Sequence, residues 1–166
     1  MLYLRCPKTL SEGNVPYIKI LAGNEKGLSL LKKAKENGIT HALVNNLGAI
    51  PLCKEFNLTI HGGFRLNIMN TESVNFFEKL GLVDLTASFE LTLQQINALG
   101  GNLKIGSIIY GKLPLMLTRN CPGINSATKS CAECGGLNYI TDRKEISFPY
   151  KCSGGCTQIY NSVPLY

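Results

Sequence analysis

Five of the seven cysteines lie close together in the last third of the chain. Their order is Cys121-x9-Cys131-x2-Cys134-x17-Cys152-x3-Cys156. Two close pairs 17 residues apart are typical of zinc ribbons. A tetrahedral set of thiolates also suits an iron–sulfur cluster. The spacing alone favours zinc, but it leaves open which metal binds and which of the five cysteines is a bystander.

The remaining cysteines and the start of the chain bear on the redox compartment. An odd number of cysteines, in a chain whose first residues are not a basic segment followed by an apolar stretch, argues against a disulfide framework. We therefore expect a cytoplasmic protein. Cys6 and Cys53 stand outside the cluster and are predicted to be small buried apolar groups.

A second set of candidates stands at or just after the ends of predicted strands. The expected catalytic residues are His61, Glu90 and Tyr110, and the expected substrate-binding residues are Arg65, Asn67 and Arg119. Because the carboxyl ends of parallel strands meet at one edge of a sheet, all six are predicted to line one pocket beside the cysteines. There the arginines would hold a carboxylate or phosphate, while Glu90 or His61 moves protons. The alternative is that these side chains only pair with one another.

The other histidine is expected to have no part in that pocket. His41 begins a predicted strand, which places it at the opposite end of the sheet, so its expected role is structural. The sequence contains no H-E-x-x-H, the motif of many zinc peptidases, and no G-x-S-x-G, the motif of the α/β-hydrolases.

The elements that must position these residues alternate along the first hundred residues. The predicted strands are Tyr17–Leu21, His41–Asn45, Leu58–His61, Val83–Ala87 and Leu103–Tyr110. Between them, helices are expected to start at Asn24, at Thr71 and at a Thr92/Gln95 capping box, and to stop at Gly38, Gly81 and Gly100–Gly101. This alternation predicts parallel βαβ units, in an open doubly wound sheet or in part of a TIM-type (β/α) barrel.

Composition and length set the outer limits. With 166 residues and 45% apolar content the chain can bury a core, which argues against disorder. It has no apolar run long enough for a membrane span. The net charge of +6 is moderate and is interpreted as ordinary surface charge. We expect a β/α half-barrel over residues 1–111 and an irregular, metal-held cysteine module over residues 112–166.

Several longer runs of sequence are similar to a known family. The runs IHGGFRLNIMNTES, LGLVDLTASFELTLQQI and IIYGKLPLMLTRNCP resemble the collagenase-like peptidases, peptidase family U32. The later segments CAEC, YITDRK and NSVPL resemble one bacterial branch of that family. The likeness covers about residues 40–166.

The resemblance implies a TIM-type barrel whose C-terminal extension binds a [4Fe–4S] cluster, which reverses the preference for zinc. Cys121 matches the cysteine after the Leu-Pro-Leu segment, while Cys131 or Cys134, and Cys152 or Cys156, match later ligands. Some members have a further ligand seven residues before Cys121, where this chain has Pro114. His61 and Glu90 match strand-end positions of the family.

The resemblance also implies a choice of functions. Characterised relatives hydroxylate RNA or act in oxygen-independent ubiquinone hydroxylation, and others carry the name of peptidases. We expect an iron–sulfur hydroxylase acting on an RNA base or a quinone precursor, with peptide hydrolysis or a non-catalytic metal-stabilised module as alternatives. The expected partners are RNA or a small anionic substrate, and the other half of the barrel would come from a longer chain or a partner chain.

Overall fold

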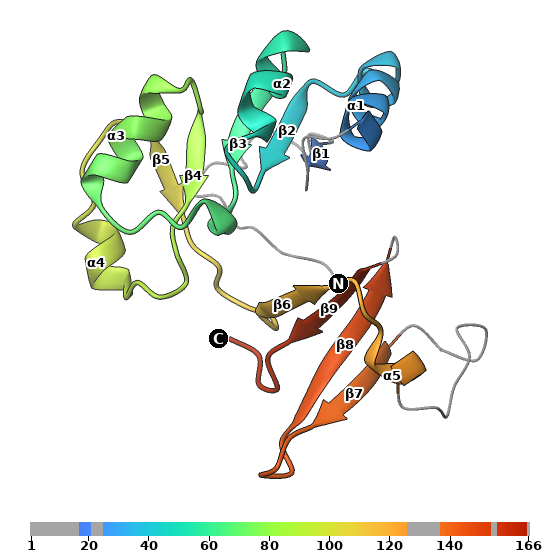
Figure 1. Ribbon diagram of the computed structural model, residues 1–166. Helices are drawn as coiled ribbons and strands as arrows, with labels where there is room; N and C mark the ends of the chain where they lie inside the picture. The colour runs from blue at the N-terminus through green and yellow to red at the C-terminus, as the bar shows by residue number, and fades with distance from the viewer. Residues whose placement is uncertain (1–16, 21–24, 126–136, 154–155, 166) are drawn as a thin grey trace. The chain divides into compact units, whose positions relative to one another are not determined.

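The computed structural model describes residues 17–20, 25–125, 137–153 and 156–165 (Figure 1). These residues form two compact units, one ending at Ile108 and the other beginning at Ile109. We call them the parallel unit and the cysteine unit and describe each by itself.

The parallel unit is built on a five-stranded sheet. Its strands are β1 (Tyr17–Ile20), β2 (His41–Val44), β3 (Thr59–Gly62), β4 (Asp84–Thr86) and β5 (Lys104–Gly106). They are all parallel and lie in the order β1-β2-β3-β4-β5, the order of the sequence. The five predicted strands are thereby confirmed. The last is shorter than expected, because β4 ends at Thr86, whose partner in the register is Gly106.

Helices follow the strands along the chain. They are α1 (Glu25–Glu36), α2 (Ala49–Glu55), the short 3-10 helix η1 (Phe64–Leu66), α3 (Thr71–Lys79) and α4 (Leu93–Asn97). Sequence reasoning missed α2, whose N-cap Gly48 has no capping side chain and whose third residue is Pro51. Among the described helices, none has the length and hydrophobicity that crossing a membrane requires.

The helix ends match most of the predicted start and stop signals. Gly38 and Gly81 have positive φ just after α1 and α3, and the capping box of Thr92 and Gln95 is present at α4. The prediction that Thr71 caps α3 is wrong by one residue. Asn70 is the N-cap and accepts a hydrogen bond from the Ser73 N–H, while the Thr71 hydroxyl accepts one from the Gly100 N–H.

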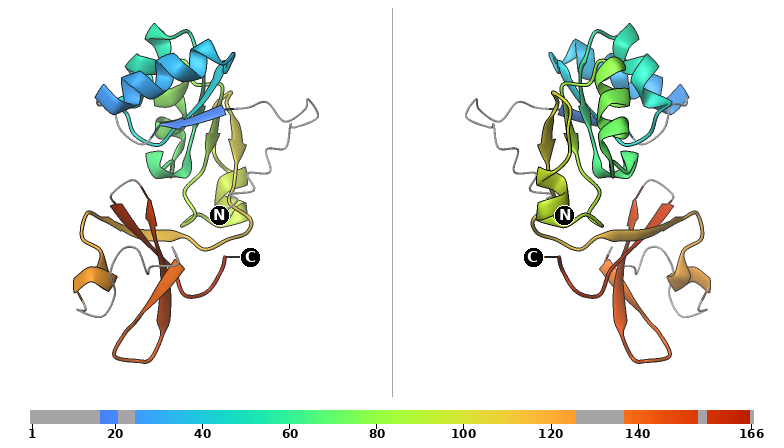
Figure 2. Two further views of the ribbon diagram at one scale, coloured as in Figure 1. Left: turned by 90° about the vertical axis from the view of Figure 1, so that its right-hand side faces the viewer. Right: turned by 90° about the vertical axis from the view of Figure 1, so that its left-hand side faces the viewer.

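The two faces of the parallel sheet differ in chemistry because successive side chains of a strand point to opposite faces. On one face Ala42, Val44, Ile60 and Leu85 form the core, which α1, α2 and α3 cover with Leu31, Ile50, Cys53, Val74 and Phe77 (Figure 2). The other face, which we call the polar face, carries His41, Leu43, Thr59, His61 and Asp84. These five are only partly buried.

The cysteine unit contains a four-stranded antiparallel sheet. Its elements are β6 (Pro114–Thr118), α5 (Pro122–Asn125), β7 (Leu137–Thr141), β8 (Ser147–Ser153) and β9 (Cys156–Tyr160), with strand order β6-β9-β8-β7. The prediction that residues 112–166 are irregular is therefore wrong for the part that is described. The sequence did not reveal these strands because Pro149 is unusual inside a strand. In the structure it lies in β8 at a position that pairs with β7 and not with β9. The buried polar Thr157 also breaks the apolar alternation of β9.

The core of the parallel unit yields a stability prediction. Leu85 is fully buried among the covering helices, whereas nearby Val83 is 47% exposed. Replacing Leu85 with Ala leaves a cavity and should lower the free energy of unfolding by about 2–5 kcal/mol. Val83→Ala is the matched control and should change it by no more than ~0.5 kcal/mol. Urea titration of both variants measures the difference, and equal losses would contradict the assigned faces.

Candidate functional site

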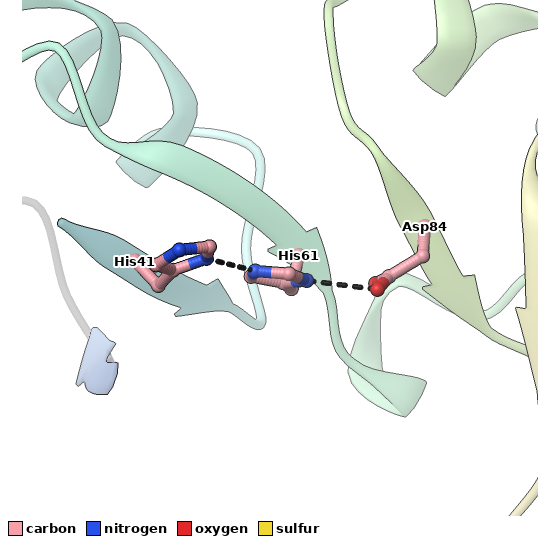
Figure 3. Close-up of polar contacts among 3 residues, drawn as sticks. All are labelled: His41, His61 and Asp84. Atoms are coloured by element: carbon pink, nitrogen blue, oxygen red, sulfur yellow. Dashed lines mark hydrogen bonds and ion pairs between the residues drawn. The ribbon is translucent and has the colours of Figure 1, made fainter. Parts of the chain in front are cut away.

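Three side chains on the polar face form one hydrogen-bonded chain across β2, β3 and β4 (Figure 3). Nδ1 of His41 lies 2.8 Å from Nε2 of His61. Nδ1 of His61 lies 2.8 Å from Oδ2 of Asp84. The two imidazole rings are nearly parallel and meet edge to edge, with their centroids 5.1 Å apart and an interplanar angle of 24°. The geometry is that of a proton-transfer chain that ends on a carboxylate.

The strand register brings these residues together. His61 is paired directly with Asp84, while its partner on β2 is Leu43, two residues after His41. His41 therefore points to the same face as His61 and reaches it diagonally. The three residues are 20 and 23 positions apart, which is one strand–helix unit each.

Partial burial tunes this chain electrostatically. The side chains of His61 and Asp84 are 21% and 18% exposed. Burial and then the neighbouring His61 lower the pKa of His41 from its usual 6.5, and the Asp84 carboxylate opposes them by raising it. A lowered pKa keeps His41 neutral at pH 7, the form in which one ring nitrogen can accept a proton.

The sequence did not predict that His41 and Asp84 belong to this hydrogen-bonded group. His41 begins β2, as predicted, but the expectation that it is separate from His61 is wrong, since the two rings are joined by a hydrogen bond. Asp84 is not among the site residues predicted from the sequence. His41 precedes His61 by one strand–helix unit, and Asp84 follows it by one. This spacing is the sequence signal that could have placed all three on the same face of the sheet.

Three other predicted residues follow β3 and β4 in the parallel unit. Arg65 lies in η1 with its guanidinium 5.8 Å from the centre of the Phe64 ring. Asn67 ends η1 with a left-handed φ of 53°. Glu90 is exposed in the turn after β4. The rings of Phe64 and Phe89 are 6.1 Å apart, so the segments that carry Arg65 and Glu90 are neighbours.

The remaining two predicted residues belong to the cysteine unit. Tyr110 is 60% exposed, and Arg119 is exposed directly after β6. The common pocket of all six residues therefore stays a prediction.

The carboxyl ends of β2 and β4 carry further buried polar groups. Asn45, Thr86 and Ser88 are each at most 8% exposed. The Asn45 amide forms no hydrogen bond with any described residue. It packs so closely on Gly63 that a Cβ there would lie 2.3 Å from its Oδ1. This edge of the sheet thus holds hydrogen-bonding capacity that the described residues do not use.

In the cysteine unit, two of the predicted metal ligands lie side by side. Sγ of Cys121 is 3.8 Å from Sγ of Cys152, and Cys152 contacts the Thr157 hydroxyl at 3.2 Å. Hydrogen bonds from the backbone N–H groups of Ile124 and Gly123 lower the pKa of the Cys121 thiol, although burial acts in the opposite direction. The surroundings therefore favour the thiolate, the form that binds metals.

The two thiols and the distance between their sulfurs can be compared with what a single metal ion and an iron–sulfur cluster require. Thiols stabilised by N–H donors fit a thiolate-bound metal. Two thiolates on one tetrahedral ion with metal–sulfur bonds of about 2.3 Å lie about 3.8 Å apart, as Cys121 and Cys152 do. A four-iron cluster binds each cysteine through a different iron, which places the sulfurs about 6 Å apart. By distance alone the pair favours one shared ion, whereas the resemblance implies a cluster.

The other cysteines have separate places. Cys156 begins β9 and is partly buried, while Cys6, Cys131 and Cys134 lie outside the described residues. The described part of the chain contains no group of three or more metal-binding side chains. Cys53 is fully buried in α2, and burial raises the pKa of its thiol to about 11. This confirms its prediction as an inert apolar group.

Comparison with known proteins identifies the family. The sequence profile of peptidase family U32 matches residues 24–136, more than half of the chain. This chain belongs to peptidase family U32. The match begins just before α1 and includes the hydrogen-bonded chain of the polar face, together with Cys121, Cys131 and Cys134. No curated protein and no solved structure matches the sequence.

The charges around His41 give a prediction for this U32 chain. His61 lowers the pKa of His41 and Asp84 raises it, so the two variants should act in opposite directions. His61→Asn should raise the pKa of His41 toward 6.5, and Asp84→Asn should lower it further. NMR titration of the His41 ring proton measures both. Shifts in the same direction would contradict the charge arrangement.

Proposed function

We propose that this U32 chain belongs to an oxygen-independent hydroxylase whose substrate is an RNA base or a quinone precursor. The observation that carries the proposal is the chain His41–His61–Asp84 on the polar face. Replacing a C–H bond by a C–OH bond with the oxygen of water releases two protons and two electrons, so the reaction needs a base for the protons and an external electron acceptor for the electrons. Two imidazoles backed by a carboxylate are suited to act as the base.

The partners of the imidazoles favour proton transfer over activation of a protein nucleophile. Serine and cysteine hydrolases place the base within hydrogen-bond reach of a hydroxyl or thiol. Within the described residues, His61 is bonded to His41 and Asp84 instead. In the part of the chain that the structure describes, neither ring has a hydroxyl or thiol side chain among its hydrogen-bond partners.

The proposed cofactor is a [4Fe–4S] cluster held by four of the cysteines Cys121, Cys131, Cys134, Cys152 and Cys156, with zinc as the alternative. When bound, a cluster supplies one-electron transfer, and a zinc ion in this unit would stabilise the fold. The Cys121–Cys152 pair, its N–H donors and the family membership support a metal here.

Substrate binding is proposed for the residues expected from the sequence. Arg65, Asn67 and Arg119 would hold an anionic group such as an RNA phosphate or a carboxylate. Glu90 and Tyr110 would assist proton transfer. The proximity of the Arg65 and Glu90 segments supports the part of this pocket that lies within the parallel unit.

We further propose that the parallel sheet is an arc of a TIM-type barrel, completed by a longer chain or a partner chain and working in the cytoplasm. Support comes from the strand order, which does not reverse among the five described strands, and from helices on one face. A doubly wound sheet reverses its order and carries helices on both faces.

Peptide hydrolysis is the second candidate. The Asp84–His61 pair at 2.8 Å has the geometry of a general base and its orienting carboxylate. With a water molecule as nucleophile, the same pair would serve amide cleavage. A non-catalytic, metal-stabilised module is the remaining alternative.

A metal assay tests the cofactor. The full chain, purified without oxygen, should contain about four iron and four sulfide per chain and absorb visible light. Cys121→Ser and Cys152→Ser should each lose most of this metal, and Cys53→Ser, the control in the apolar core, should keep it. One zinc per chain without iron would contradict the cluster and support a single shared ion.

Cells lacking the gene test the reaction. Mass spectrometry of their RNA nucleosides and quinones should reveal the loss of one hydroxylated product, which the wild-type gene restores. Genes carrying His61→Asn or Glu90→Gln should restore it at least ~100-fold less efficiently, because each removes a proton-transfer group. The metal content of both variants should stay unchanged.

Two results would contradict the hydroxylase. Unchanged RNA and quinones, with cleavage of a protein substrate by the purified chain, would favour the peptidase. Full activity of both variants would instead remove His61 and Glu90 from the reaction.

A further inference from the structure

We infer that the atom which exchanges a proton with the substrate is Nε2 of His41, and that His61 and Asp84 act behind it as a relay. The inference rests on the proposed proton-transfer site and does not depend on which substrate is bound. It assigns the leading role to a residue that the sequence indicated to be structural.

The carboxylate sets the direction of every hydrogen bond in the chain. An ionised carboxylate only accepts hydrogen bonds, so Nδ1 of His61 must carry a proton and donate it to Asp84. In neutral His61 the other nitrogen, Nε2, has no proton and accepts. Its partner at 2.8 Å, Nδ1 of His41, must therefore donate. This leaves Nε2 of neutral His41 without a proton and with a lone pair that no described residue uses.

The same geometry removes His61 from direct contact with a reactant. Both of its ring nitrogens are engaged, one with His41 and one with Asp84 (Figure 3). Of the two ring nitrogens of His41, only Nδ1 takes part in these hydrogen bonds. Its ring meets that of His61 edge to edge and is partly buried on the polar face. The basic nitrogen that the chain presents is therefore on β2.

The proton step balances within these three residues. A substrate X–H loses its proton to Nε2 of His41, and the electron pair of the broken bond stays on X. The proton on Nδ1 of His41 moves to Nε2 of His61 at the same time. His41 ends neutral with its proton on Nε2, and His61 ends as an imidazolium whose charge lies next to the Asp84 carboxylate. The reverse sequence returns a proton to the product.

This arrangement is suited to a weakly acidic substrate. The positive charge that forms is placed on His61, 2.8 Å from a carboxylate, rather than on the residue that touches the substrate. The carboxylate stabilises that charge and so strengthens the base that takes the proton, as a weakly acidic substrate requires. A carbon acid, such as a position next to a carbonyl group in a nucleobase or quinone precursor, is the class of substrate that we infer. Its reacting proton lies over β2.

The positions of the ring protons provide a direct test that needs no substrate. The chain contains only two histidines, so a nitrogen-15 NMR spectrum of the full chain at neutral pH shows two imidazoles. His41→Gln assigns them by removing one. We expect both rings with the proton on Nδ1 and an unprotonated Nε2. A proton on Nε2 of neutral His41 would overturn the inference.

Two carboxylate variants test the cause of that arrangement. Asp84→Asn puts a group that can donate or accept next to His61, so the Nδ1–H form of His41 should fall from the dominant species to a minority. Glu55→Gln, which changes an exposed carboxylate of α2, should leave it unchanged. An unchanged His41 in folded Asp84→Asn would contradict the relay.

Activity then separates this inference from the proposed function. If the relay operates in the wild-type protein, the gene carrying His41→Gln should restore the hydroxylated product as poorly as the gene carrying His61→Asn does. If His41 is in the expected form but RNA and quinones do not change without the gene, the proposed hydroxylase fails and the relay stands. If the product is lost in His61→Asn and fully kept in His41→Gln, the relay fails and the hydroxylase stands.

Discussion

The separation of the parallel sheet into an apolar face and a polar face is the constraint on which the described site depends. Alternation along β2, β3 and β4 sends Ala42, Ile60 and Leu85 into the helix-covered core and leaves the intervening positions for other chemistry. A one-residue slip in the register would exchange the faces. His61 would then enter the core and lose its hydrogen bond to Asp84, so the packing of the core also maintains the polar chain.

Glycine provides the close approach that this arrangement needs. A Cβ at Gly62 would lie 2.4 Å from Leu85 on the core side, and one at Gly63 would collide with Asn45 on the other. The pair directly after His61 thus lets β3 fit between its neighbours. Packing therefore requires glycine at both positions. A larger residue would displace the end of β3 from the place where it forms hydrogen bonds with β2 and β4.

The two units divide the chemistry between them. The parallel unit offers two imidazoles and a carboxylate, groups that can transfer protons, and the cysteine unit offers thiols, groups that can bind metals. In each unit backbone geometry prepares the side chains. Strand register aligns His41, His61 and Asp84, and the N–H groups of Ile124 and Gly123 support the thiolate of Cys121.

Local signals in the sequence were enough for much of this protein. Apolar runs located the five parallel strands, and positive-φ glycines and the Thr92/Gln95 box located helix ends, because these depend on a few neighbouring residues. Family membership also followed from the sequence. The cysteine spacing predicts a metal site, and that site stays a prediction.

Tertiary structure decided what depends on residues far apart in the chain. Whether His41 meets His61, and whether Asp84 orients them, is set by strand register over 20 and 23 residues. Residues 112–166 contain short strands that become recognisable only when they pair, because Pro149 and Thr157 break the local pattern. The contact between Cys121 and Cys152 follows from the same pairing. Local propensity determines where a strand begins, but only its neighbours determine which side chains meet.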